Sequence, residues 1–226
     1  MGGKRLIDGM FALAGAAVLV MAAAAPALGD VNLASSAAGW RILTTVTLPN
    51  AHTNYKTTHP DAVEGGGLSF SLPNSTDGYT NYLLRNYNQD LSGQTITAVV
   101  SVSGSPTFVV RPGCGTGTPA SVRIEFQDTA AGTYLFTDYW WSDVRGATTL
   151  ASASAAPATL VGNTSDLSDW SDINGESAVV HEAEFKAALQ NVKEVNLSFG
   201  GGSCFANGVG VTGGTALFTV HNLTIS

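Results

Sequence analysis

Thr95-Ile96-Thr97-Ala98-Val99-Val100-Ser101-Val102-Ser103 is the stretch that decides the fold. Apolar residues occupy every second position from Ile96 to Val102, and small polar residues fill most of the positions between them. Side chains of a strand alternate between its two faces, so this pattern predicts a strand with one buried face that ends at Gly104. Comparable patterns recur at residues 42–48, 68–72, 79–85, 108–111, 122–127, 134–141, 195–199, 216–220 and 223–225, and more weakly at 148–152 and 159–162.

A single segment has the period of a helix. Phe185, Ala188 and Leu189 fall on one face of it, and acidic residues precede Lys186, the order that the helix dipole favours. One short helix near residues 182–190, among many strands with Gly, Pro and Asn turns, predicts an all-β protein. We expect a two-sheet antiparallel β-sandwich of the jelly-roll kind. The Ala- and Ser-rich segment 147–158 is expected to hold a surface strand and a loop.

The N-terminal segment has the pattern of a secretory signal peptide. Lys4 and Arg5 precede an uncharged apolar run over residues 10–25, and Ala27-Leu28-Gly29 places small residues where a signal peptidase cleaves. A membrane-spanning helix needs about 20 strongly apolar residues, and this run is shorter and rich in Ala. We therefore expect residues 1–29 to be a signal peptide and residues 30–226 to form a single β-sandwich domain, secreted or at the cell surface. A retained membrane anchor is the alternative.

The chain is acidic. Its 10 basic and 17 acidic residues give a net charge of −7, and removal of Lys4, Arg5 and Asp8 with the signal peptide changes this to −8. Binding of nucleic acid depends on neutralising its phosphates, so we expect no nucleic-acid partner, and no membrane insertion after signal removal. None of the Gly-rich stretches 65–67, 200–202 and 208–214 stands between a strand and a helix, so we expect no nucleotide or other cofactor. The sequence gives no indication of oligomeric state.

Cys114 and Cys204 are the two cysteines of the chain, and each lies in a Gly-rich stretch. In an oxidising compartment an even pair of cysteines is more often a disulfide than two free thiols. We expect a Cys114–Cys204 disulfide, with unpaired thiols as the alternative. Two cysteines without neighbouring histidines lack a zinc ligand set, and we expect no metal here.

The C-terminal part resembles galactose-binding-like jelly-roll domains, many of which are carbohydrate-binding modules. The resemblance rests on the helical segment 185–192, the strand 195–199, the Gly-rich loop after it and the closing strand 217–225. It implies a β-sandwich and a carbohydrate ligand. Such modules often carry carboxylates for a structural calcium near the last strand, where this chain has His221 and Asn222. We therefore do not carry the calcium site over from the resemblance.

The segment Asp138-Tyr139-Trp140-Trp141 is the most informative local feature. Adjacent residues of a strand point to opposite faces, so one Trp is expected in the core and the other beside Asp138 and Arg145. An indole ring can stack on the apolar face of a sugar, while carboxylate and guanidinium groups bind its hydroxyls. Burial of both Trp side chains is the alternative.

A second polar and aromatic group surrounds Tyr82 and Arg85. Tyr79, Tyr87 and several Asn residues lie near them in sequence, a composition typical of binding surfaces. An edge strand with its turn would have the same composition. The predicted ligand-binding residues are therefore Asp138, Tyr139, Trp140, Trp141, Arg145, Tyr82 and Arg85.

Acidic residues suggest two further kinds of site. Asp166, Asp169 and Asp172 could bind calcium, but their spacing lacks the Gly and Glu of an EF-hand, and helix capping or solvent exposure also explains them. A glycosidase needs only two suitably spaced carboxyl groups, for which the first candidates are Glu64, Glu125, Asp128 and Asp138. The four His residues form no HExxH motif, and no Gly-x-Ser-x-Gly is present. We predict no catalytic residue and no metal site.

Three functions remain open on the sequence. The first is a secreted, non-catalytic binding module for an extracellular glycan. The second is a structural or adhesion protein of the cell envelope that binds a surface partner, which the low charged fraction of 12% suits. The third is a glycoside hydrolase-type enzyme.

Overall fold

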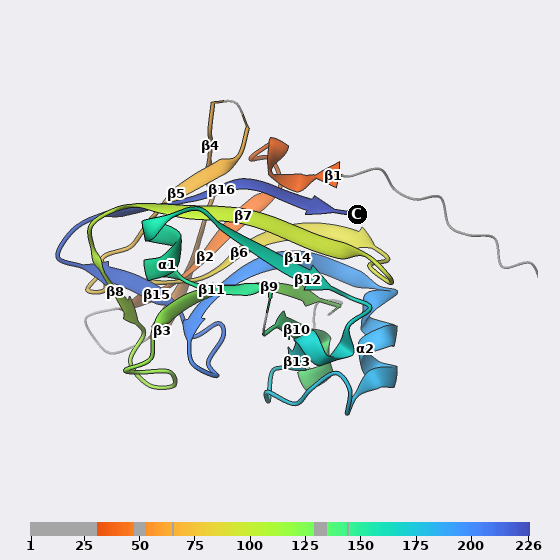
Figure 1. The fold of residues 1–226 in the computed structure, drawn as a ribbon. Helices are drawn as coiled ribbons and strands as arrows, with labels where there is room; N and C mark the ends of the chain where they lie inside the picture. The colour runs from red at the N-terminus through yellow and green to blue at the C-terminus, as the bar shows by residue number, and fades with distance from the viewer. Residues whose placement is uncertain (1–30, 48–52, 65, 129–134, 144) are drawn as a thin grey trace, which may run out of the picture.

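The computed structural model describes residues 31–47, 53–64, 66–128, 135–143 and 145–226. These residues form two antiparallel sheets packed face to face, with two short helices (Figure 1). The prediction of an all-β, two-sheet jelly-roll sandwich is thereby confirmed. The predicted signal peptide lies outside the described residues. Within them, no helix has both the length and the apolar composition needed to cross a membrane.

The smaller sheet is built on the alternating stretch at residues 95–103. Its strand order is β12-β7-β16-β5-β4, and β1 also pairs with β16. The strands β7 and β16 are its centre, with Val102 opposite Phe218 and Val100 opposite Val220. The bounds of its strands are β1 Val31–Asn32, β4 Asp61–Ala62, β5 Leu68–Leu72, β7 Thr95–Gly104, β12 Ala158–Asn163 and β16 Ala216–Ile225.

The larger sheet carries the order β13-β10-β9-β14-β6, and β6 pairs in addition with β2 and β15. The strand β3 extends the sheet beyond β2, and β8 extends it beyond β15. In addition, β11 pairs with β9. The bounds are β2 Trp40–Thr47, β3 Thr53–Thr58, β6 Gly78–Gln89, β8 Thr107–Val110, β9 Ala120–Gln127, β10 Tyr139–Ser142, β11 Ala147–Thr149, β13 Trp170–Asp172, β14 Val192–Gly201 and β15 Val209–Thr212.

The core lies between the inner faces of the two sheets. Phe199 of β14 and Phe218 of β16 meet edge to face with ring centroids 5.0 Å apart, and Phe70 of β5 contacts both rings. Edge-to-face aromatic pairs add to the stability gained from burying their area. The alternating apolar residues of β7, β9 and β16 fill the remaining space, and all of them are buried.

The predicted helix is α2, Glu182–Leu189. Its Phe185 is fully buried and lies within 6 Å of Trp140, Trp170 and Phe126, measured between ring centroids. The helix therefore covers the aromatic end of the core beside β10 and β13.

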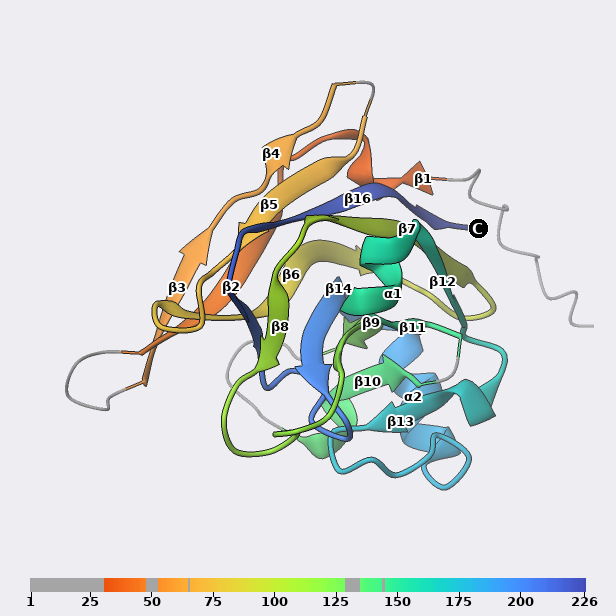
Figure 2. The ribbon, with the colours of Figure 1, turned by 60° about the vertical axis from the view of Figure 1, so that its left-hand side comes forward.

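A second helix, α1, replaces the predicted strand at residues 148–152. The strand β11 ends at Thr149, and α1 spans Leu150–Ala155. The Thr149 side chain accepts a hydrogen bond from the Ser152 amide (3.1 Å), a typical N-cap. Leu150 and Ala153 share one helix face and are buried. The helix packs against β7 of one sheet and β9 of the other, as Figure 2 shows.

Candidate ligand-binding face

One row of side chains crosses the outer face of the larger sheet. Strand pairing places Leu84, Asn196, Glu125, Trp141 and Ser171 in register, one from each of β6, β14, β9, β10 and β13. Paired residues of neighbouring strands point to the same face of a sheet. We call these five residues the outer row. Each is buried although the row faces away from the core.

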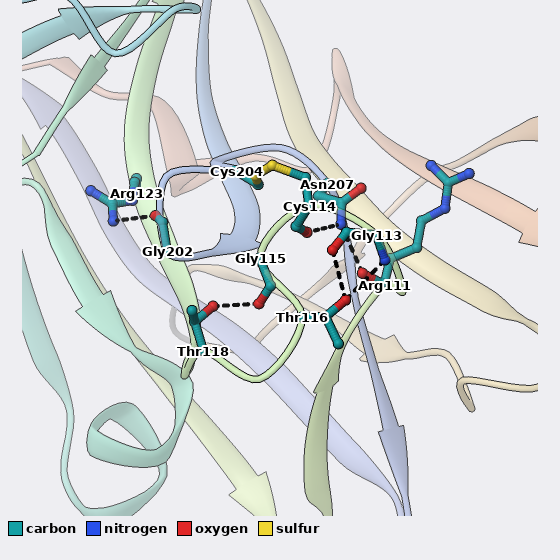
Figure 3. Close-up of a disulfide and its surroundings, with 10 residues drawn as sticks. All are labelled: Arg111, Gly113, Cys114, Gly115, Thr116, Thr118, Arg123, Gly202, Cys204 and Asn207. Carbon is teal, nitrogen blue, oxygen red and sulfur yellow. Dashed lines mark hydrogen bonds between the residues drawn. A yellow bond between two sulfur atoms is a disulfide. The ribbon is translucent and has the colours of Figure 1, made fainter.

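A loop covers part of the outer row. Residues 202–208 follow β14, and the Cys114–Cys204 disulfide ties this loop to the Gly-rich segment after β8, with the two Cα atoms 5.7 Å apart (Figure 3). Asn207 Nδ2 donates to the backbone oxygens of Arg111 (2.8 Å) and Cys114 (2.5 Å). The disulfide predicted from sequence is thus part of a hydrogen-bonded pair of loops.

Phe205 brings this loop into contact with the sheet. Its ring lies 5.5 Å from that of Trp141 between centroids, and the guanidinium of Arg123 lies 4.3 Å from its centroid. Arg123 also forms an ion pair with Asp143 (3.1 Å). Burial lowers the pKa of Arg123 and raises that of Asp143, and the attraction between the two charges opposes both changes in pKa.

A hollow of about 210 Å³ opens between the loop and the sheet. It is smaller than the roughly 300–1,000 Å³ typical of sites for drug-sized ligands. Its walls are largely aromatic and apolar, with a polar rim and the disulfide at one side. The residues that line it include Tyr82, Trp141, Ile173, Ser203, Phe205 and Asn207.

Glu125 is the buried carboxyl group of the outer row. Asn196 Nδ2 donates a hydrogen bond to its Oε2 (2.6 Å), while Oε1 has no hydrogen-bond partner among the described residues. Burial raises the pKa of Glu125 to about 8, and the hydrogen bonds from Asn196 and Gln127 oppose this rise. Glu125 therefore keeps its proton at neutral pH.

Three of the predicted ligand-binding residues come together at this face. Tyr82 and Trp141 line the hollow, and Tyr139 stacks nearly parallel on Trp141 with ring centroids 6.1 Å apart. Trp141 Nε1 donates to Ser198 Oγ (2.9 Å), which fixes the indole plane. Trp141 is only 2% exposed, so it forms the floor of the hollow rather than an open platform.

The other predicted ligand-binding residues lie elsewhere. Trp140 points into the core, as the alternation of adjacent residues requires, and is fully buried. Asp138 accepts a hydrogen bond from the Leu135 amide (2.7 Å) at the start of a 3-10 helix.

The two predicted arginines also lie away from the hollow. Arg145 is exposed and pairs with Asp166 (2.7 Å). Arg85 stacks against Trp40 and donates to the Ala38 backbone oxygen, on the other face of the larger sheet from Tyr82.

Sequence reasoning missed Phe205, Ile173, Ser203 and Asn207. All four lie in loops, which have no periodic pattern, and only folding of the chain brings these loops against the outer row. The one local signal for Phe205 is its position directly after Cys204, which follows a Gly-rich stretch.

The carboxyl candidates for hydrolysis are spread over the molecule. Glu64 is exposed in the loop after β4, and Glu125 is sealed in the outer row. Asp128 lies beside Asp138, and the Asp128 amide donates to the Asp138 backbone oxygen (3.0 Å). Burial, followed by the charge of Asp138, raises the pKa of Asp128 to about 6. This pair lies at the end of β9.

A larger hollow, of about 480 Å³, lies between α2 and the loops at residues 92–93 and 164–167. Hydroxyl, amide and charged groups line it together with two leucines, and no aromatic ring is among its lining residues. The polar lining residues include Ser92, Thr164, Glu182, Lys186 and Gln190. Stacking on a sugar ring needs an aromatic surface, so we place the candidate ligand site at the smaller hollow.

No protein-family model matches the sequence, and no curated protein sequence matches it. Among solved structures, the fold is similar to a xylan-binding module, CBM15, with 14% sequence identity and a TM-score of 0.43. The match covers 87% of this chain and 94% of that module. The likeness concerns the fold alone.

Proposed function

We propose that this protein is a secreted, non-catalytic module that binds an extracellular glycan at the hollow on the outer face of the larger sheet. The observation that supports the proposal is the lining of the hollow. Three aromatic rings, those of Tyr82, Trp141 and Phe205, surround a space with polar groups at its rim. Export, which the sequence of residues 1–29 predicts, brings this surface into contact with polysaccharide outside the cell.

The size and chemistry of the hollow define how a glycan would bind. Its volume suits one sugar ring, whose apolar face would stack on Phe205 or Tyr82. Ser203 at the exposed rim would donate or accept hydrogen bonds with the ring hydroxyls. The side-chain oxygen of the half-buried Asn207 would accept one, because its amide nitrogen already donates to Arg111 and Cys114. The rest of the polymer would extend across the outer face. No bond is made or broken in this mechanism.

Filling the hollow, or removing one of its aromatic walls, should weaken glycan binding. Ser203 is exposed, so Ser203→Trp should fill the hollow without disturbing the core, and Phe205→Ala should remove one aromatic wall. We expect each variant to weaken affinity for the bound polysaccharide at least tenfold, or about 1.4 kcal/mol. Affinity electrophoresis against a panel of soluble polysaccharides identifies the ligand, and isothermal titration calorimetry measures Kd.

Leu217→Ala is the control, because Leu217 is a 42%-exposed apolar residue on β16, a strand of the smaller sheet. It should bind as the wild type does. The proposal is wrong if no polysaccharide retards the protein, or if Ser203→Trp and Phe205→Ala bind with unchanged Kd. No observation in the described part of the chain specifically favours the adhesion or the hydrolase alternative.

A further inference from the structure

Three side chains of metal-ligand type converge between β13 and the start of α2. His181 Nε2 lies 2.7 Å from Glu176 Oε2 and 4.0 Å from Asp172 Oδ2. One ligand atom from each of the three residues lies within 4.8 Å of the other two. The cluster is distinct from the hollow: Asp172 pairs in register with the core residue Trp140, whereas its neighbour Ser171 pairs with Trp141 of the outer row.

The two oxygens of Asp172 have different surroundings. Oδ1 accepts hydrogen bonds from the amides of Asn174 (2.8 Å) and Glu176 (2.9 Å). Oδ2 is buried and has no hydrogen-bond partner among the described residues. A buried carboxylate oxygen without a partner is costly, and coordination of a cation would remove that cost. Oδ2 is also the oxygen that faces His181.

The loop between Asp172 and His181 holds the ligands in place. The Asp172 amide donates to the Glu176 backbone oxygen (2.9 Å), and the Gly175 amide donates back to that of Asp172 (2.9 Å). Gly175 has φ +79°, which a residue with a Cβ rarely adopts, so the tight turn depends on this glycine. Ala178 N donates to the Trp170 oxygen (2.9 Å) and anchors the loop to β13. Three ligand groups are therefore brought together before any ion binds.

We propose that Asp172, Glu176 and His181 form a binding site for a divalent transition-metal ion, with zinc as the best fit. One imidazole nitrogen and two carboxylate oxygens are ligands that zinc accepts at about 2.0–2.2 Å. Calcium requires six to eight oxygens, and magnesium prefers octahedral oxygen ligands with several waters. Three protein ligands leave a fourth tetrahedral position for water.

The site can adjust to the ion at its exposed side. The side chain of Glu176 is 56% exposed and that of His181 is 20% exposed, whereas Asp172 is fully buried. Tetrahedral ligands at about 2.0–2.1 Å from zinc stand about 3.3 Å apart, so Glu176 and His181 must separate slightly from hydrogen-bond distance. Phe136 contacts the His181 ring with centroids 5.5 Å apart and limits its movement on that side.

The acidic segment considered for calcium contributes only one ligand to this site. Asp166 pairs with Arg145, and Asp169 accepts hydrogen bonds from Ser142 Oγ (2.8 Å) and the Arg145 amide (3.1 Å). Asp172 is the residue of this segment whose buried Oδ2 has no hydrogen-bond partner among the described residues, so this oxygen can bind a metal ion. The site therefore combines Asp172 at the end of that segment with Glu176 of the following turn and His181, the residue before α2.

Zinc titration of the full secreted protein, without a polyhistidine tag and after dialysis against chelator, tests the site. Isothermal titration calorimetry with ZnCl2 at neutral pH should show one ion bound per chain. Asp172→Asn, Glu176→Gln and His181→Gln should each weaken zinc binding at least tenfold. Because Glu176 is exposed, its variant should fold even if a change at the buried Asp172 impairs folding.

Glu184→Gln is the matched control. Glu184 is close enough for its charge to raise the pKa of His181, but it does not belong to the cluster. Its variant should bind zinc within twofold of the wild type. Nuclear magnetic resonance of the imidazole groups should show the His181 signals, rather than those of His59 or His221, shifting with zinc. Absence of zinc binding, or binding that all three cluster variants retain, would overturn the proposal.

Discussion

The Glu125→Gln variant should lose most of the pH dependence of stability that the wild-type protein shows between about pH 4.5 and pH 8. Burial raises the pKa of Glu125 from 4.5 to about 8 in the folded protein. Across this range the folded state keeps a proton that the unfolded chain releases. The stabilising contribution is therefore complete below the unfolded pKa and is lost as the pH rises through the folded pKa. A pKa difference of one between the folded and unfolded states corresponds to about 1.36 kcal/mol, so the free energy of unfolding should fall by up to about 5 kcal/mol.

Urea unfolding at a series of pH values from 4.5 to 9 measures this effect. Asp128 and Asp143 also have raised pKa values and act in the same direction, so the wild-type curve alone does not isolate Glu125. The difference in unfolding free energy between wild type and Glu125→Gln isolates the contribution of Glu125. The variant should become the more stable protein as the pH approaches 9. Glu64→Gln, which changes an exposed carboxyl group, should follow the wild type. Parallel curves for wild type and Glu125→Gln would show that Glu125 ionises normally.

The double variant Cys114→Ser/Cys204→Ser should lower the free energy of unfolding by about 4–5 kcal/mol. The disulfide closes a loop with a sequence separation of 90 residues. A crosslink of this span removes much of the conformational freedom of the unfolded chain, and the chain-entropy model gives this magnitude. The loss is comparable to the whole stability of a marginal domain.

Denaturant unfolding of the double variant, compared with wild type under oxidising conditions and with reductant added, measures the loss. Ser203→Ala changes the exposed neighbour of Cys204 and should leave stability within about 0.5 kcal/mol of wild type. The disulfide also fixes the loop that carries Phe205. If the hollow binds glycan as proposed, the double variant should also bind it more weakly, even at temperatures where the variant is fully folded. A stability change below about 1 kcal/mol would contradict the chain-entropy account.

The strands with regular alternation could be predicted from the sequence. Leu68–Leu72 is β5 with the bounds that the pattern indicates, and the stretch at 95–103 is β7 with one residue added. In these strands one face is buried against the other sheet, so local periodicity reports the tertiary environment. The opposite orientation of Trp140 and Trp141 followed from the same rule.

Elements without periodicity could not be predicted. The strand β15, Val209–Thr212, lies in a Gly-rich stretch that resembles a turn. A Cβ at Gly210 would stand 2.9 Å from the Gly78 backbone oxygen, so close packing of two backbones, which no local pattern reveals, selects glycine there. The strand β13 has only three residues and lies in an acidic segment. Its pairing with β10 determines its structure.

The candidate binding face depends on long-range register, and this explains why the sequence predicted it only in part. The alternation at residues 122–127 places Glu125 on the face opposite Ile124 and Phe126, and there the neighbouring strands and the outer-face side chains bury it. Arg85 is three residues from Tyr82 and therefore lies on the opposite face of β6. His181 looked isolated because its partners Asp172 and Glu176 approach it only through a tight turn at Gly175.

The loop closed by the disulfide also limits how far the protein can be stretched. If tension pulls the two ends of the folded chain apart, β1 and β16 separate first, because these terminal strands pair with each other, Val31 opposite Ile225. Further unravelling stops at Cys114 and Cys204, which share a covalent bond. Roughly 300 Å of contour length, the extended span of the 90 residues between them, stays inaccessible to force. Because Phe205 directly follows Cys204, one wall of the proposed ligand site lies next to the point at which extension ends.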